Sequence, residues 1–106
     1  MTAQDRFVEF VLDQLSGLAG VRTRRMFGGL GLYLRESFFG LVYDGRLYLK
    51  TDDETRGWFE ERGMSSFQPN ERQRFPTYME VPAESLEEPE ELSRLAAEAA
   101  SRPARR

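Results

Sequence analysis

The chain has 106 residues, of which 40% are hydrophobic, and carries a formal net charge of −3. Because it contains neither cysteine nor histidine, disulfides, thiolate metal sites and most acid–base triads are excluded. We therefore expect no enzyme activity, no metal and no cofactor. No segment reads as a secretory leader or reaches the ~18–20 apolar residues of a membrane span, so we expect a soluble cytoplasmic protein without membrane contact.

Size and charge distribution narrow the possibilities further. Domains of roughly 100–150 residues are the commonest, so we expect a single domain over residues 1–106, ordered over about 5–100, with a frayed tail at 101–106. Residues 1–50 carry 7 basic and 5 acidic side chains, whereas residues 51–106 carry 8 basic and 13 acidic ones. The acidic half would repel phosphates, so we expect no tight direct binding of DNA.

The first predicted element is an amphipathic helix over residues 5–19. Apolar side chains recur there at three- and four-residue steps, among them Val11 and Leu15. Thr2 and Asp5 have the spacing of an N-terminal capping box. A glycine at position 17 or 20 is a suitable end of the helix.

Three β-type runs follow, over residues 30–34, 38–43 and 46–50. The last two are separated by Asp44-Gly45, a pair that tolerates the positive φ angles of a type I′ hairpin turn. The pattern predicts a three-stranded antiparallel meander. We expect Leu41, Tyr43, Leu47 and Leu49 to share its buried face.

The second half predicts a helix, two short strands and a last helix. Thr51 and Glu54 have capping-box spacing, and the helix they start should end at Gly63. Extended segments at 65–68 and 77–81 flank a polar connection at 69–75, and Pro89 favours a helix start. The order is α-β(3)-α-β(2)-α, an α+β fold with helices packed on an antiparallel sheet.

The run Arg24-Arg25-Met26-Phe27-Gly28-Gly29-Leu30-Gly31 is the most distinctive in the chain. Its glycines could cradle a phosphate, but the run enters a strand rather than a helix, which favours glycines that shape the entry into the sheet. Candidate ligand- or partner-binding residues are Arg22, Arg24, Arg25 and Phe27, a basic and aromatic patch suited to single-stranded nucleic acid. The alternative is a solvated edge strand protected by its charges.

The remaining candidates are acidic pairs and aromatic groups. Neighbouring carboxylates on a helix do not face one another, so no catalytic pair is predicted. Four apolar residues near the second strand pair are candidates for an exposed homodimer interface: Phe67, Phe75, Tyr78 and Met79.

Three segments, residues 24–33, 38–52 and 78–82, resemble the N-terminal domain of the TfoX/Sxy competence-regulator family. The resemblance implies a secretion-chaperone-like α+β fold and often a homodimer. Two-domain members act with the cyclic-AMP receptor protein at certain promoters, and the family supplies no catalytic residues.

Two classes of function follow from these observations. The leading hypothesis is a non-enzymatic protein-interaction module that serves as an accessory factor in transcriptional regulation, with a transcription factor or another protein as its partner. The alternative is a small-molecule or nucleic-acid binding domain that uses the Arg22–Gly31 region.

Overall fold

A computed structural model describes residues 2–26 and 28–102. In chain order the elements are α1 (Ala3–Gln14), β1 (Val21–Met26), β2 (Gly29–Leu34), β3 (Ser37–Tyr43), β4 (Arg46–Lys50), α2 (Arg56–Glu61), β5 (Ser66–Asn70), β6 (Gln73–Glu80), α3 (Ala83–Leu86) and α4 (Pro89–Ser101). The strands form one antiparallel sheet in the order β1-β2-β3-β4-β6-β5. The predicted α+β class is confirmed, with one strand and one short helix more than the sequence suggested.

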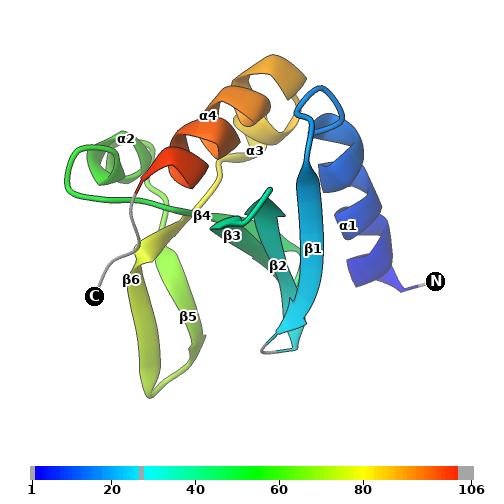
Figure 1. Ribbon diagram of the computed structural model, residues 1–106. Coiled ribbons are helices and arrows are strands. Elements are labelled where there is room, and N and C mark those ends of the chain that lie inside the picture. The colour runs from blue at the N-terminus through cyan, green and yellow to red at the C-terminus, as the bar shows by residue number, and fades with distance from the viewer. Residues whose placement is uncertain (1, 27, 103–106) are drawn as a thin grey trace.

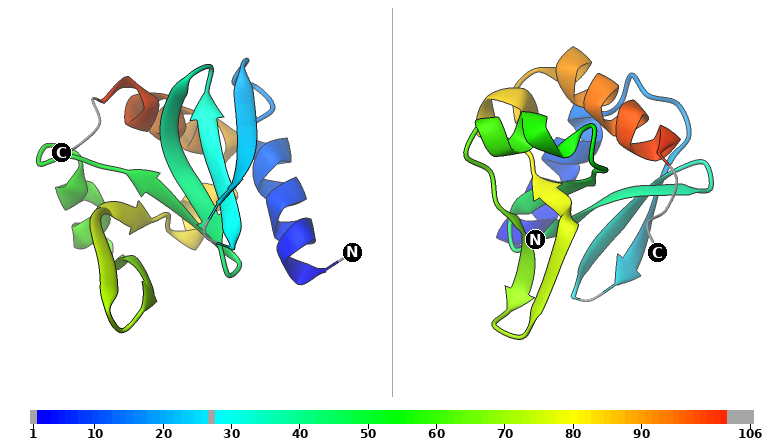
Figure 2. Two further views of the ribbon diagram at one scale, coloured as in Figure 1. Left: turned by 60° about the horizontal axis from the view of Figure 1, so that its bottom comes forward. Right: turned by 90° about the vertical axis from the view of Figure 1, so that its left-hand side faces the viewer.

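The helices are gathered on one face of a bent sheet (Figure 1). Helix α4 contacts β2, β3 and β4, while α2 packs near β6 and α1 contacts α4. The β1–β2 and β5–β6 hairpins both project away from α4 and toward the same side of the molecule (Figure 2). No helix formed by the described residues covers the opposite face of the sheet.

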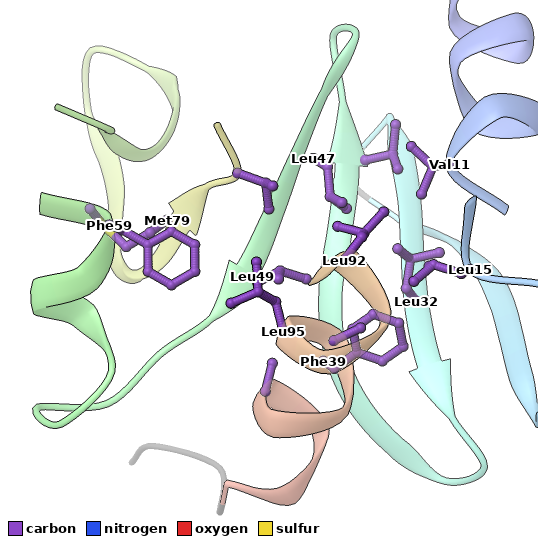
Figure 3. Close-up of a cluster of buried hydrophobic side chains, with 14 residues drawn as sticks. Val11, Leu15, Leu32, Phe39, Leu47, Leu49, Phe59, Met79, Leu92 and Leu95 are labelled. Atoms are coloured by element: carbon purple, nitrogen blue, oxygen red, sulfur yellow. The ribbon is translucent and has the colours of Figure 1, made fainter. Parts of the chain in front are cut away.

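The main core lies between the sheet and the helices, as Figure 3 shows. Val11 of α1, Phe59 of α2 and Leu92 of α4 meet strand residues such as Leu32 and Leu49 there. Fully burying a side chain of this size stabilises the fold by about 1.5–3 kcal/mol, so this cluster dominates the stability of the domain.

Helix α1 begins as the sequence predicts and ends earlier. The Asp5 backbone N–H donates to the Thr2 hydroxyl oxygen at 3.1 Å, and the Thr2 N–H donates to the Asp5 carboxylate at 3.2 Å, so the capping box is confirmed. The predicted end at residue 19 is wrong, because the backbone leaves the helix at Leu15 and Gly20 turns it with a φ of 93°.

The Asp44-Gly45 turn is confirmed, with φ angles of 52° and 74° at the two residues. The expectation of one shared buried face is wrong. Leu47 and Leu49 point into the main core, whereas Leu41 lies on the other face, opposite Tyr48. The tight turn pairs Val42 with Leu47 and Leu41 with Tyr48, so Leu41 and Tyr43 fall on the face opposite to that of Leu47 and Leu49.

The predicted capping box at residues 51–54 is wrong as well. Thr51 is buried, and its hydroxyl donates to the Thr77 carbonyl oxygen at 2.7 Å. The Asp52 carboxylate instead accepts the N–H groups of Glu54 and Thr55, each at 3.0 Å. Helix α2 therefore starts only at Arg56.

The predicted polar connection at 69–75 is a β-hairpin turn. Asn70 pairs with Gln73, and the Asn70 side-chain oxygen accepts the N–H groups of Arg72 and Gln73 at 2.8 and 3.0 Å. Because this side chain closes the turn, β6 begins at Gln73 rather than at residue 77.

Candidate functional site

The sheet face without a helix carries a second, smaller hydrophobic cluster. Leu41, Tyr48 and Phe67 are buried in it. Four further residues pack against them while partly exposed: Phe38, Tyr43, Phe75 and Tyr78. We call this surface the aromatic face.

The aromatic rings hold one another in edge-to-face and stacked contacts. Phe38 lies 5.2 Å from Tyr33 and 5.8 Å from Tyr78 between ring centroids, with interplanar angles of 67° and 69°. Phe67 stacks on Phe75 at 5.4 Å and 24°. Such pairs are favourable beyond their buried area, and they fix the rings relative to each other.

An apolar pocket of ≈ 210 Å³ opens within this face. Its walls come from four strands, β1, β3, β5 and β6, and consist of Met26, Phe38, Leu41, Phe67, Phe75 and Tyr78. Sites for drug-sized ligands occupy about 300–1,000 Å³, so this one is on the small side. Its size and lining suit a single bulky apolar side chain better than a cofactor.

A larger and more polar pocket of ≈ 670 Å³ adjoins the same aromatic cluster. Tyr43 and Tyr48 line it, and the ring of each contacts Phe67. Burial raises the pKa of Tyr48, so its hydroxyl stays protonated near neutral pH. Arg46 at this pocket is already paired with Glu80, at 3.3 Å.

Strand β1 divides its side chains between the two sides of the sheet. Met26 lines the apolar pocket, whereas Arg25 lies beside Asp5 and the start of α1. Because side chains alternate along a strand, Arg22 and Arg24 share the side of Met26. Both are exposed, and neither forms an ion pair with any residue in the described ranges.

The predicted basic patch is therefore only partly assembled. Arg22 and Arg24 lie together, Arg25 faces the helical side, and Phe27 lies outside the described residues. As the alternative interpretation expects, β1 is the outermost strand at its end of the sheet and its arginines are exposed; the protective role of their charges stays a prediction.

The glycine run serves packing rather than phosphate binding. A Cβ on Gly29 would lie 2.3 Å from the Val42 carbonyl oxygen, so no side chain fits there. A Cβ on Gly31 would lie 2.7 Å from the Met26 ε-methyl, which rests across this glycine at the edge of the apolar pocket. The run joins two strands and opens no helix, so it lacks the helix N-terminus of a phosphate cradle.

The four proposed interface residues separate into two pairs. Phe67 and Met79 are only 3% and 2% exposed within the monomer, so the expectation that they are exposed is wrong. Met79 points into the main core, and Phe67 is enclosed by its aromatic neighbours. Phe75 and Tyr78 remain partly exposed at the apolar pocket, and their role in a dimer stays a prediction.

Sequence reasoning did not identify Met26, Phe38 or Leu41 as pocket residues. A signal was present in β1. Met26 lies two and four residues after Arg24 and Arg22, so the three side chains fall on the same side of the strand. For Phe38 no such signal existed, because the register shift between β2 and β3 breaks the alternation between Phe38 and Leu41.

A cluster of charged side chains fixes the end of α4 to the rest of the domain. The Arg102 guanidinium lies 3.1 Å from the Asp52 carboxylate and 2.7 Å from that of Glu54. The Lys50 ammonium donates to the Arg102 carbonyl oxygen at 2.8 Å, and burial lowers the pKa of Lys50. These contacts tie the end of α4 to the segment before α2.

Two general features of the described residues bear on function. Within 2–26 and 28–102, no three metal-ligating side chains of His, Cys, Asp or Glu type come together. No helix in the same part of the chain has the length and apolar character needed to span a membrane.

The TfoX N-terminal domain family matches residues 13–102, which include all six strands and the whole aromatic face. The chain belongs to the TfoX N-terminal domain family. This TfoX N-terminal domain is 41% identical over 64 residues to the DNA transformation protein TfoX1 of Aliivibrio fischeri. It is 38% identical over 60 residues to an uncharacterized 12.7 kDa protein in the trpE 5′ region of Spirochaeta aurantia.

The two relatives differ in how much of them is matched. The first alignment covers 60% of this chain and 29% of the Aliivibrio protein, and the second covers 57% of this chain and 52% of the Spirochaeta protein. The chain thus matches less than a third of one relative and about half of the other.

Proposed function

We propose that this TfoX N-terminal domain is a non-enzymatic protein-interaction module whose working surface is the aromatic face. The apolar pocket on a sheet face without helical cover is the observation that carries the proposal. Contiguous apolar surface on a soluble domain marks an interaction site more often than an idle surface. The mutually packed rings give that surface a fixed shape, which favours specific docking.

The chemistry around the pocket supports binding rather than catalysis. The sequence has no histidine or cysteine to act as base or nucleophile near neutral pH. Burial raises the pKa of Tyr78, so the phenol at the pocket is a neutral group. The Ser85 hydroxyl does not line this pocket; it is buried in the helical layer, where it donates to the Glu91 carboxylate.

The biological context comes from the relative named for DNA transformation. We place this domain as an accessory factor in the regulation of transformation, acting through contact with a transcription factor or another regulatory protein. The family match covers all six strands, and the strands build the pocket. This supports the proposal that the relative uses the same surface for the same role.

Photo-cross-linking in the native host tests the proposal. The amino acid p-benzoylphenylalanine replaces Phe75 at the pocket, and in a matched control it replaces Glu90, which is exposed on α4. We expect one or a few discrete protein adducts when the probe is at position 75. The same adducts should be absent when the probe is at position 90. Adducts with nucleic acid alone, or the same adducts from both positions, would contradict the proposal.

A further inference from the structure

The charges of this molecule are sorted by layer. The six strands contain six basic residues, Arg22, Arg24, Arg25, Arg46, Lys50 and Arg74, and one acidic residue, Glu80. The four helices contain three basic and nine acidic residues. The sheet is therefore the basic layer of a protein whose overall charge is negative, and its potential favours an acidic partner.

Two of the basic side chains remain unpaired on the side of the apolar pocket. Arg46 has Glu80 as its partner, Lys50 is buried against the end of α4, and the Arg74 guanidinium donates to the Gln68 side chain. Arg22 and Arg24, on the same side of β1 as the pocket residue Met26, are exposed and form no ion pair among the described residues. An arginine guanidinium binds carboxylates through paired hydrogen bonds, so these two side chains suit acidic groups at the rim.

The pocket itself limits what enters. Its ≈ 210 Å³ and its apolar lining match one bulky apolar side chain. An anchor of this kind, surrounded by charged contacts at the rim, is the usual arrangement at protein interfaces.

From these features we infer that the apolar pocket takes a single aromatic or large aliphatic side chain from an acidic segment of another protein, with Arg22 and Arg24 binding the flanking carboxylates. The inference rests on the proposed function and specifies the chemistry of its partner.

Two other occupants fit the surface less well. In a symmetric contact between two aromatic faces, the strands would offer Arg22 and Arg24 no free carboxylate, because Glu80, the single acidic residue in the strands of the described ranges, is paired with Arg46. Single-stranded nucleic acid needs free ring faces for stacking. Here Phe38 directs its contacts edge-to-face to Tyr33 and Tyr78, and Phe67 is stacked on Phe75.

Fluorescence anisotropy with synthetic peptides tests the inference. The probe is a labelled 15-residue peptide with one central Phe flanked by Asp and Glu. Two matched peptides replace the Phe by Ala or the acidic residues by Lys. We expect saturable binding of the first peptide, at least about tenfold weaker binding of the Ala peptide, and no binding of the Lys peptide.

Protein variants locate the charges. The double variant R22S/R24S should bind the acidic peptide about three- to tenfold more weakly, as expected for two partly exposed ion pairs. The control R25S/R94S removes the same charge from the other side of β1 and from the exposed face of α4, and should bind like wild type. Raising the salt concentration should abolish the difference between the two variants.

Several outcomes would overturn the inference. Equal binding by both double variants would remove the role of Arg22 and Arg24, and preference for the Lys peptide would reverse the charge of the partner. Competition by a 15-residue oligothymidylate at lower concentration than the peptide would assign the face to nucleic acid. Absence of any peptide binding would also sink the inference, while protein adducts from position 75 would leave the proposed function standing.

Discussion

At the scale of single residues, Gly29 shows how closely the strands approach one another. A Cβ at this position would lie 2.3 Å from a backbone oxygen, which cannot move without disturbing β3. Gly29→Ala should lower the free energy of unfolding by about 1–3 kcal/mol, as overpacking generally does. Urea denaturation followed by circular dichroism measures the change.

Gly57 supplies the control for this substitution. It lies inside α2, and a Cβ there meets nothing within 4 Å. Gly57→Ala should therefore raise the free energy of unfolding by up to about 1 kcal/mol, since alanine favours a helix. Equal losses from both alanine variants would refute the steric explanation at Gly29.

Asp52 gives the domain a pH-dependent contact. Burial alone would raise the pKa of Asp52, but the N–H groups of Glu54 and Thr55, the Thr55 hydroxyl and nearby Arg102 together lower it. The stabilisation by the ionised carboxylate is therefore complete above the ordinary aspartate value of ~4 and is lost as the pH falls through the lowered folded-state pKa.

Asp52→Asn tests this contact, because asparagine keeps an oxygen acceptor and removes the charge. The variant should have a lower Tm than wild type at pH 7, and the difference should shrink toward pH 3. Thermal unfolding at a series of pH values provides the measurement. A Tm difference that grew on acidification would show that the charge has the opposite effect.

At the scale of elements, α4 holds the sheet and α1 in place. Leu92 is fully buried in the main core between them. Leu92→Ala should cost about 2–5 kcal/mol of unfolding free energy, whereas Arg94→Ala on the exposed side should change it by no more than about 0.5 kcal/mol. Denaturant titration of both variants measures this, and similar losses would contradict the packing described.

The elements also show what the sequence alone could predict. Local sequence patterns that span only a few residues predicted the structure correctly. The Thr2–Asp5 capping box, the Asp44-Gly45 turn and the Pro89 helix start all appear in the structure. The capping box predicted at Thr51 was wrong because the Thr51 hydroxyl donates to a carbonyl oxygen 26 residues away, and no local pattern reveals that contact.

The candidate site was less predictable than the elements. The arginines of β1 were found from the sequence, and strand alternation separates Arg25 from the other two, but which side faces the apolar pocket depends on the packing of β1 in the sheet. The apolar pocket needs Met26 to meet residues from β3, β5 and β6, and the bend of the sheet that brings these strands together leaves no mark in the sequence.

At the scale of the whole molecule, self-association is the first question. The family resemblance implies a homodimer, so sedimentation equilibrium at micromolar concentration should return about twice the chain mass of 12.3 kDa. The sequence predicted Tyr78 at the dimer interface, whereas docking of another protein at the apolar pocket requires that Tyr78→Glu leave the dimer intact. Dissociation by this substitution would assign the pocket to a second copy, and a monomeric wild type would refute the dimer.

The most direct test of docking at the aromatic face uses two methionines as probes. Met26 lies at the apolar pocket, and Met79 lies in the main core on the opposite side of the sheet. With ¹³C-methyl-labelled methionine, the protein is titrated with the partner that cross-links at position 75. We predict that the Met26 methyl resonance shifts to saturation while that of Met79 stays in place. Saturable binding that left the Met26 resonance unchanged would contradict docking at the aromatic face.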